Sequence, residues 1–474
     1  MRATPRRTRS SPLTQPGSPT PAAAPASAYL SDNFAPVSTE VTAFDLPITG
    51  TVPIELDGRY LRNGPNPIGP VDPATHHWFL GDGMVHGVRL RDGRAEWYRN
   101  RYVGSSAVSA HRGVPDIPGP NWNDSALGAN TNVGGFAGRT WAMVEAGGTP
   151  VELTDELESV CRNDFFGTLP GAFSAHPKHD PTTGELHAMC YAWPQWMDHV
   201  QYVVVGPDGL VRRTVDIPLP GMTMLHDMSI TERYAVVYDQ PCTVDLDVAF
   251  AGSSFPFRWN PDYGNRVGLL RRDGDAADII WVDVPIGYSF HPMNAYDTPD
   301  GKVVIDLCTY PVMFANDVLG PFGDGSTGRL ERWEVDPQRR SVSTTVIDES
   351  ANEFPRHRGS LNGRPYRYGY CAAVSTDAGA GWPTIKHDLV SGTREAFDHG
   401  PHRAAGEPVF VARPDGTAED DGWLITFVHD LAADTAELVV IDAADFSRPL
   451  VASVQLPQRV PFGFHGNWVP TAVS

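Results

Sequence analysis

Four histidines of this chain stand at the head of similar sequence stretches, and their side chains are of a kind that binds metal ions. They are His176, His226, His291 and His465, in FSAHPKHDPTTGEL, MLHDMSITERYAVV, SFHPMNAYDTPDG and PFGFHGNWVP. Each is followed by a turn and then by a β-rich run. Because the histidine recurs at the start of successive units, the imidazoles would meet wherever those units converge. A ring of repeats would build a metal site on its axis in this way.

Four neutral imidazoles favour the chemistry of a redox metal ion. Imidazole suits Zn, Cu, Fe and Ni, but a structural zinc site usually includes cysteine. A redox ion with open positions for a small molecule is therefore the better prediction. Carboxylates should then accept the other ring N–H of the ligands and fix their orientation. We expect Glu145, Glu353 and Glu407, at the head of the remaining units, to do so.

The repeat itself predicts a β-propeller. Each unit has strand, turn and strand, with Asp-Gly or Asp-Pro at the turns, as in YVVVGPDGLVRRTVDIPL and RLERWEVDPQRRSVSTTVID. The unit heads follow one another at intervals of 50 to 65 residues, the size of a propeller blade. Five units lie between His176 and His465 and about two more fit before them, so we predict seven blades. The short segment after His465 should pair with N-terminal strands and close the ring.

Composition favours one all-β domain over residues 40–474. The length would allow about three domains of roughly 150 residues each, but no linker interrupts this span. The 46 glycines and 43 prolines suit a fold with many turns. Residues 1–30, rich in Arg, Ser, Pro and Ala, are predicted to be disordered. No apolar run follows the early arginines, so we expect no export signal.

Charge and cysteine content limit the partners and the compartment. The formal charge of −20 argues against nucleic acid as a partner. No run approaches the roughly 20 apolar residues that span a bilayer. The five cysteines are scattered without a CxxC pair, which favours free thiols in a reducing cytoplasm.

The order of motifs resembles that of the carotenoid cleavage oxygenase family. The resemblance rests on GRYLRNGPNP, GDGMVHGVRL with NRYV, HPKHDPTTGEL, LHDMSIT, FHPMNAYD, EFPR, GEPVFV followed by EDDGW, and FGFHGNW. It implies a seven-bladed β-propeller with a cap of loops and short helices over an axial metal site. It also implies a non-haem Fe(II) dioxygenase that cleaves a conjugated C=C bond with O2 and gives two carbonyl products.

Carried over by motif, the resemblance assigns roles to particular residues. The iron ligands would be His176, His226, His291 and His465. Adjacency suggests that Glu353 supports His291 and that Glu407 supports His465, which leaves Glu145 for His226. Thr131, fourteen positions before Glu145, corresponds to a threonine whose methyl group crowds one coordination position in the family. O2 would then have one site at which to bind.

The substrate is predicted to be a carotenoid or apocarotenoid. Stilbene-cleaving relatives carry a lysine immediately before the first of the three glutamates, and here that position is Val144. An aliphatic side chain cannot supply a charge-assisted bond to a phenol oxygen. Tyr102 could still offer a hydroxyl, so cleavage of a stilbene is the alternative. An inactive propeller scaffold is the alternative from another class, but a scaffold has no reason to keep four axial histidines and three glutamates.

Two sets of residues are candidates for contact with such a substrate. Residues 247–264, DVAFAGSSFPFRWNPDYG, are an apolar loop whose equivalent in relatives borders the mouth where a lipid-soluble substrate enters, which makes them the candidate for peripheral membrane contact. Eight aromatic residues could line an apolar tunnel: Trp193, Trp196, Phe255, Phe257, Trp259, Phe290, Trp382 and Phe464. Either set could instead fill space between or over the blades.

Overall fold

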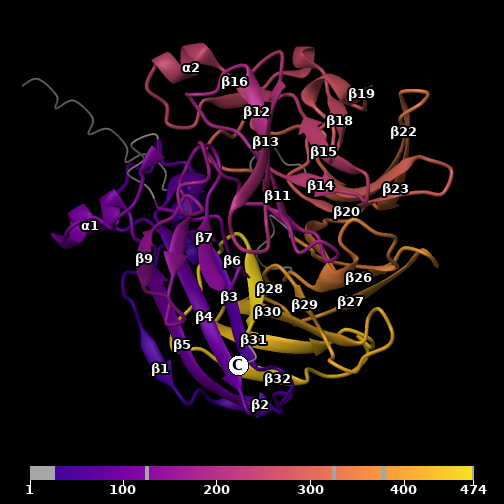
Figure 1. Cartoon of the computed structure of the whole chain (residues 1–474). Coiled ribbons are helices and arrows are strands. Elements are labelled where there is room, and N and C mark those ends of the chain that lie inside the picture. Colours follow the sequence, from indigo (N-terminus) through magenta and orange to yellow (C-terminus); the bar gives the residue numbers. More distant parts are fainter. Residues whose placement is uncertain (1–26, 123–127, 323–326, 375–380, 472–474) are drawn as a thin grey trace, which may run out of the picture.

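Seven β-sheets follow one another around a central axis in the computed structural model of the chain (Figure 1). The structure describes residues 27–122, 128–322, 327–374 and 381–471. Each of these sheets has four to six strands, and neighbouring strands pair antiparallel. The predicted seven-bladed β-propeller is therefore confirmed.

Apart from β33, the strands of the first four blades lie between residues 42 and 283. Blade 1 contains, in spatial order, β1 (Thr42–Phe44), β5 (Arg94–Tyr102), β4 (Gly83–Arg91), β3 (Gly58–Pro65) and β33 (Gly466–Pro470). Blade 2 contains β6 (Asn132–Phe136), β7 (Arg139–Met143), β8 (Val151–Leu153) and β9 (Ser159–Arg162). Blade 3 contains β10 (Lys178–His179), β11 (Leu186–Cys190), β12 (His199–Val205) and β13 (Val211–Pro218). Blade 4 contains β14 (Met228–Ile230), β15 (Tyr234–Asp239), β18 (Arg266–Arg271) and β19 (Ile280–Asp283).

Three more blades complete the ring. Blade 5 contains β20 (Pro292–Asp297), β21 (Val303–Thr309), β22 (Arg329–Asp336) and β23 (Ser341–Asp348). Blade 6 contains β24 (Glu353–His357), β25 (Tyr368–Ala372), β26 (Thr384–Asp388) and β27 (Thr393–Phe397). Blade 7 contains β2 (Ile48–Gly50), β32 (Ala452–Gln455), β31 (Thr435–Asp442), β30 (Gly422–Asp430) and β28 (Arg403–Ala405), with β29 (Val409–Ala412) also on β30.

Short helices and loops connect the blades. In the described part of the chain the α-helices are α1 (Ser106–Arg112) and α2 (Leu246–Phe250), and β16 (Cys242–Val244) pairs with β17 (Phe257–Trp259) beside α2. The 3-10 helices are η1 (Ala28–Leu30), η2 (Asp32–Phe34), η3 (Trp78–Leu80), η5 (Pro261–Tyr263), η6 (Ala276–Asp278) and η7 (Gly359–Leu361). Among the described residues, no helix is both long and apolar enough to cross a membrane.

The burial of each strand follows from its place in the blade. In blade 3, β12 is buried from Val200 onward, whereas the outer strand β13 alternates between exposed or half-buried and buried positions over its second half. Alternation is expected for a strand with one face on the sheet packing and one in solvent. The turn between these strands contains the predicted Asp-Gly pair, and Gly209 there has a φ of +82°, which glycine adopts without strain.

Apolar side chains of neighbouring blades meet in shared clusters. Val236 and Leu269 of blade 4, for example, pack in one cluster with Ile305 and Trp333 of blade 5. Removal of apolar surface from water stabilises such a contact by about 25 cal/mol per Å². Each blade is therefore held by both of its neighbours, and stability is spread around the ring.

The two ends of the chain interlock to close the ring. β33 pairs antiparallel with β3, from Gly58 opposite Pro470 to Arg62 opposite Gly466. β2, near the start of the described chain, pairs with β32 of blade 7. In Figure 1 the last strands, in yellow, accordingly lie beside the first, in indigo. The predicted pairing of the C-terminal segment with N-terminal strands is confirmed, and it covers a sheet edge that would otherwise be open.

The folded body begins before residue 40. Of the segment predicted to be disordered, residues 1–26 lie outside the described residues. Residues 27–30 belong to the folded structure, because Tyr29 in η1 is buried between Trp78 and Phe34. Its hydroxyl also lies 3.3 Å from the carboxylate of Asp317.

The close contact between the two ends of the chain leaves no room for a side chain at Gly64. A Cβ added to Gly64 in β3 would lie 2.6 Å from the Cα of Gly463, which leads into β33. We expect Gly64→Ala to lower the free energy of unfolding by about 1–3 kcal/mol, as overpacking does. Urea-induced unfolding would measure it. Gly359→Ala is the matched control, since a Cβ there meets nothing within 4 Å; equal stability of the two variants would contradict the expectation.

Candidate metal centre

The four predicted histidines lie directly before strands that begin their blades or close the ring. His176 is two residues before β10 and His226 two residues before β14, whereas His291 and His465 come immediately before β20 and β33. Because all these strands start on the axis, their preceding residues converge there. Side chains far apart in the sequence are thereby brought to one point.

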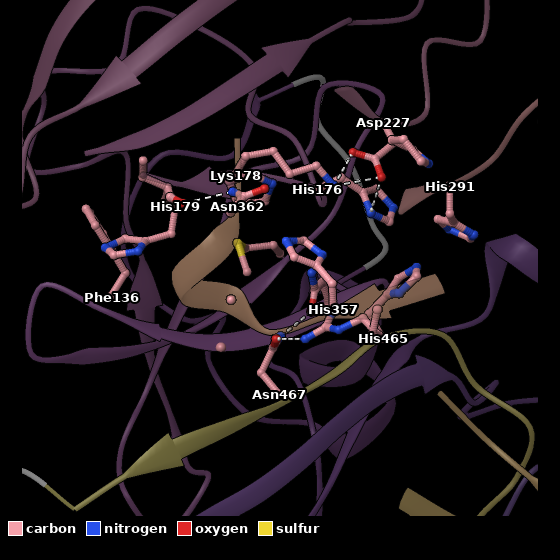
Figure 2. A pocket seen from close by; sticks show the side chains of 18 of the residues that line it. Phe136, His176, Lys178, His179, Asp227, His291, His357, Asn362, His465 and Asn467 are labelled. Carbon is pink, nitrogen blue, oxygen red and sulfur yellow. Dashed lines mark hydrogen bonds and ion pairs between the residues drawn. The ribbon is translucent and has the colours of Figure 1, made fainter. Parts of the chain in front are cut away.

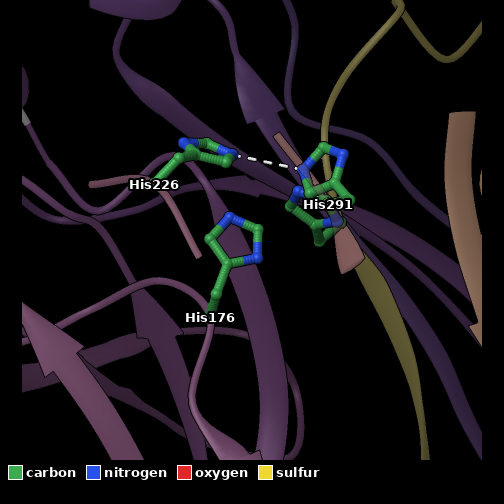
Figure 3. A group of neighbouring side chains, drawn as sticks. His176, His226 and His291 are labelled. Atoms are coloured by element: carbon green, nitrogen blue, oxygen red, sulfur yellow. Dashed lines mark hydrogen bonds between the residues drawn. The ribbon is translucent and has the colours of Figure 1, made fainter. Parts of the chain in front are cut away.

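The four imidazole rings form one buried cluster (Figure 3). One ring nitrogen from each histidine lies within 4.8 Å of those of the other three. Nε2 of His226 and Nε2 of His291 are only 3.2 Å apart. The structure therefore brings all four predicted histidines together.

This donor set fits a divalent metal ion. Metal–imidazole bonds of about 2.0–2.1 Å place two neighbouring nitrogens on one ion about 3 Å apart, close to the His226–His291 distance. Nε2 of His176 is buried and has no hydrogen-bond partner in the described part of the chain. Such an unsatisfied group is costly unless something binds it. Its lone pair is suited to a metal ion.

Three glutamates lie against the outer nitrogens of three of these rings. Oε1 of Glu145 is 2.8 Å from Nδ1 of His226. Oε2 of Glu353 is 2.6 Å from Nδ1 of His291, and Oε1 of Glu407 is 3.0 Å from Nδ1 of His465. These are the pairs that adjacency suggested. A carboxylate at Nδ1 favours the tautomer with a proton there, which leaves Nε2 free to bind a metal.

The electrostatics of the cluster reflect burial and these pairs. Burial lowers the pKa of His176 well below its ordinary value, and the neighbouring histidines lower it further. Burial likewise lowers the pKa of His465 to about 4, although Glu407 opposes this shift. Burial also opposes protonation of His291, but the charge and hydrogen bond of Glu353 outweigh it and raise its pKa. Burial therefore disfavours the charged form of His176 and His465, whereas Glu353 favours the charged form of His291.

Each glutamate is fixed by a further group that sequence reasoning missed. The hydroxyl of Tyr191 donates to Glu145 at 3.1 Å, and that of Tyr310 donates to Glu353 at 3.0 Å. Glu407 accepts the backbone N–H of Gly466 at 2.8 Å and contacts Arg356 at 3.3 Å. No local sequence signal marks the two tyrosines, because each belongs to a different blade from the glutamate that it contacts.

Glu145 does not head a unit, contrary to expectation. It follows β7, and the residue directly before the first strand of blade 2 is Thr131. The reason is the hairpin register, since Asn132 pairs with Met143 across β6 and β7. Residues before β6 and after β7 consequently emerge at the same end of the blade. The carboxylate still reaches the axis, but from the second strand.

An apolar cavity of about 330 Å³ lies on one side of the histidines. Its wall includes His226, His291 and His465 together with Thr131 and Glu145. Thr131 is buried, and its hydroxyl donates to the side-chain oxygen of Asn130 at 2.9 Å. The hydroxyl is thus already engaged, and the cavity offers an apolar ligand direct access to the centre.

Aromatic side chains form much of this cavity wall. Five of the eight tunnel candidates line it: Trp193, Phe255, Phe257, Phe290 and Phe464. Trp196, Trp259 and Trp382 do not; Trp382, for instance, stacks on Phe462 in a separate cluster. Sequence reasoning missed six others: Trp78, Phe79, Tyr191, Tyr310, Phe322 and Phe354.

Val144 and Tyr102, the two residues on which the choice between a carotenoid and a phenolic stilbene depended, differ in their position relative to the cavity. Val144 lines the cavity beside Glu145. Tyr102 does not, because its hydroxyl accepts a hydrogen bond at 2.6 Å from Asn66 in blade 1 and its ring packs on Val37 and Met84. Of the two, only the aliphatic residue faces the ligand space.

A second, more polar cavity of about 350 Å³ approaches the histidines from another side (Figure 2). His176, Lys178 and Asp227 belong to its wall. The ammonium group of Lys178 lies 2.8 Å from the carboxylate of Asp227. His179 points away from the histidine cluster toward Phe136 and is exposed, as expected for a residue outside the metal site.

Comparison with known proteins agrees with this geometry. The family model described as retinal pigment epithelial membrane protein matches residues 34–470. The chain is 44% identical to a carotenoid cleavage oxygenase of Mycobacterium tuberculosis, over 94% of this chain and 97% of the relative. It is 31% identical to an apocarotenoid-15,15'-oxygenase of Synechocystis, over 90% and 92% of the two chains.

Solved structures give the same result. The cobalt-substituted apocarotenoid oxygenase of Synechocystis superposes with a TM-score of 0.81 at 29% identity, over 92% of this chain and 97% of that one. The lignostilbene dioxygenase of Pseudomonas brassicacearum superposes with a TM-score of 0.84 at 28% identity, over 94% and 100% of the two chains. Similarity therefore covers nearly the whole length of each protein.

The cluster predicts that metal binding and folding can be separated. We expect His226→Ala to lose stoichiometric Co(II) binding while its thermal unfolding stays close to that of the parent, because stability comes from burial between blades all around the ring. Metal analysis after Co(II) loading, together with calorimetry, would check this. His179→Ala is the control and should bind normally. Full metal occupancy of the His226 variant would remove that side chain from the ligand set.

Proposed function

Since the chain belongs to the carotenoid cleavage oxygenase family, we propose that its four axial histidines hold Fe(II) as the catalytic metal. The observation that carries this proposal is the buried cluster of four imidazoles beside an apolar cavity. When bound there, the ion would supply open coordination positions at which O2 can be activated.

The protein is a dioxygenase that cleaves a conjugated C=C bond of a carotenoid or apocarotenoid. The reaction breaks one C=C bond and the O–O bond and forms two C=O bonds, so each product carries one oxygen atom. The electrons that reduce O2 come from the alkene itself. The inactive scaffold alternative is accordingly set aside.

The residues around the centre would divide the work. We assign Glu145, Glu353 and Glu407 to orientation of His226, His291 and His465 through their Nδ1 atoms. Thr131 would narrow access on the cavity side, which its place in the wall supports. The aromatic wall would hold the polyene with one double bond near the metal and exclude water from it.

The cavity favours a carotenoid over a stilbene. Cleavage of a stilbene is the second candidate, because one similar structure is a lignostilbene dioxygenase. A phenol oxygen would find Val144 in place of a cation, and Tyr102 is engaged in blade 1. An apolar chain without a charged end matches this wall better.

We also propose that residues 247–264 touch a membrane during substrate uptake. Phe250 in α2 is 84% exposed, and Leu246, directly before the segment in the same helix, is 48% exposed. Phe255 and Phe257 of the same segment line the apolar cavity. The segment thus connects an exposed apolar tip with the ligand space.

A cytoplasmic location is proposed from the cysteines. All five are free, and four of them are buried. Free thiols persist in a reducing compartment.

The membrane contact predicts a loss of vesicle binding. The double variant Leu246→Ser, Phe250→Ser should bind neutral phosphatidylcholine vesicles about tenfold more weakly in a flotation assay, because roughly half of two large side chains no longer enters the apolar layer. Val390→Ser removes another apolar side chain, 75% exposed at a distant turn, and should bind as the parent does. Undiminished binding of the double variant would exclude this segment.

The assigned chemistry predicts the fate of O2. Fe(II)-loaded protein with an apocarotenal and ¹⁸O₂ should place one labelled atom in each carbonyl product under fast quench, before aldehyde oxygen exchanges with water. No added reductant should be needed for repeated turnovers. A saturated analogue should only compete for binding. The proposed function fails if every turnover consumes an added reductant or if neither product carries label.

A further inference from the structure

His176 differs from the other three histidines in the group that lies near its outer ring nitrogen. Its outer nitrogen meets no glutamate in the described part of the chain, whereas His226, His291 and His465 each meet one. The acidic group near it is Asp227, whose Oδ2 lies 3.7 Å from Nδ1 of His176 (Figure 2). The side chain of Asp227 is only 3% exposed.

The carboxylate of Asp227 is firmly held. Lys178 contacts both of its oxygens, at 2.8 and 2.9 Å, and the backbone N–H of Met228 donates to Oδ1 at 2.6 Å. Lys178 follows His176 by two residues and Asp227 directly follows His226. The ion pair therefore joins the starts of blades 3 and 4 at the point where both present a histidine.

We propose that Asp227, held in place by Lys178, positions His176 for the metal. The carboxylate attracts the N–H dipole at Nδ1 and so turns the unsatisfied Nε2 toward the centre. This role rests on the proposed metal site and adds a fourth acidic group to the three glutamates. Asp227 is not part of the apolar cavity wall where substrate would bind, so it would act only through His176, as a positioning residue.

The balance of charge around the centre explains why Lys178 lies beside Asp227. Four carboxylates lie around the four imidazoles, and in the described part of the chain two side-chain cations contact these carboxylates: Lys178 contacts Asp227 and Arg356 contacts Glu407. A divalent ion would cancel the charge that remains. Without Lys178, Asp227 would add one uncompensated buried charge, which is costly.

The distance sets the size of the expected effect. At 3.7 Å the contact between Asp227 and His176 is longer than a hydrogen bond. The attraction is therefore electrostatic and weaker than the 2.6 Å hydrogen bond between Glu353 and His291. Loss of Asp227 should lower metal affinity about tenfold, at the lower end of the range for groups that orient metal ligands.

The competing explanation is that the ion pair only ties two blades together. Asp239 provides a matched control, because it is also a buried aspartate of blade 4, paired with Arg266 at 2.7 Å, but it touches none of the four histidines. A purely structural pair would behave as the Asp239 pair does. A positioning pair would alter the metal as well.

The test uses Co(II) as a metal with a visible spectrum, in the full-length protein. Asp227→Asn, Asp239→Asn, Glu353→Gln and the double variant Lys178→Met, Asp227→Asn are each titrated with Co(II) against a chelator. Their d–d absorption bands and thermal unfolding are recorded. The double variant leaves no unpaired charge, so it decides the question if Asp227→Asn does not fold.

We expect Asp227→Asn to weaken Co(II) binding about tenfold and to shift the d–d bands. Asp239→Asn should lower thermal stability by a similar amount but change neither Co(II) affinity nor the bands. The double variant should bind more tightly than Asp227→Asn, because the unpaired ammonium group no longer repels the ion, but less tightly than the parent. Unchanged affinity and bands in the Asp227 variants overturn the proposal. If the parent itself binds no Co(II) while folded, the proposed metal site fails instead.

Discussion

Four imidazole rings share one buried space at the axis of the ring, and burial there opposes charge on every group around them. His176 responds with a pKa well below its ordinary value. Burial also opposes ionisation of the carboxylates: it raises the pKa of Asp227 in spite of Lys178, whereas Arg356 and His465 bring the pKa of Glu407 to about 2. Removal of one partner would leave the other unpaired in a medium of low dielectric.

This centre separates two unlike spaces. The apolar cavity reaches it beside Glu145 and Glu353, and the polar cavity reaches it beside Asp227 and Glu407. A polyene can therefore approach through aromatic walls while the opposite side keeps the ion pairs that balance the charge. The tyrosines that fix two of the glutamates also line the apolar cavity. The apolar cavity wall thus includes groups that hold the glutamates beside His226 and His291.

Much of the fold could be predicted because its signals are local. Turns such as the one at Gly209, and histidines or glutamates at blade-length intervals, mark the units without reference to the rest of the chain. The expectation that Glu145 heads a unit was wrong, because in blade 2 Glu145 follows the second strand and Thr131 precedes the first. Hairpin register decides that placement, and the spacing of motifs does not report it.

The sequence by itself determined the number of blades, the closure by the C-terminal strand and the identity of the axial histidines. A sequence repeat shows which residues occupy equivalent positions in successive units. Only the tertiary structure decided which groups hold the three glutamates and which group lies near the outer nitrogen of His176. Tyr191, Tyr310 and Asp227 come from different blades than Glu145, Glu353 and His176, the residues that they contact. Such contacts depend on how neighbouring blades pack around the axis, and that packing is a property of the closed ring as a whole.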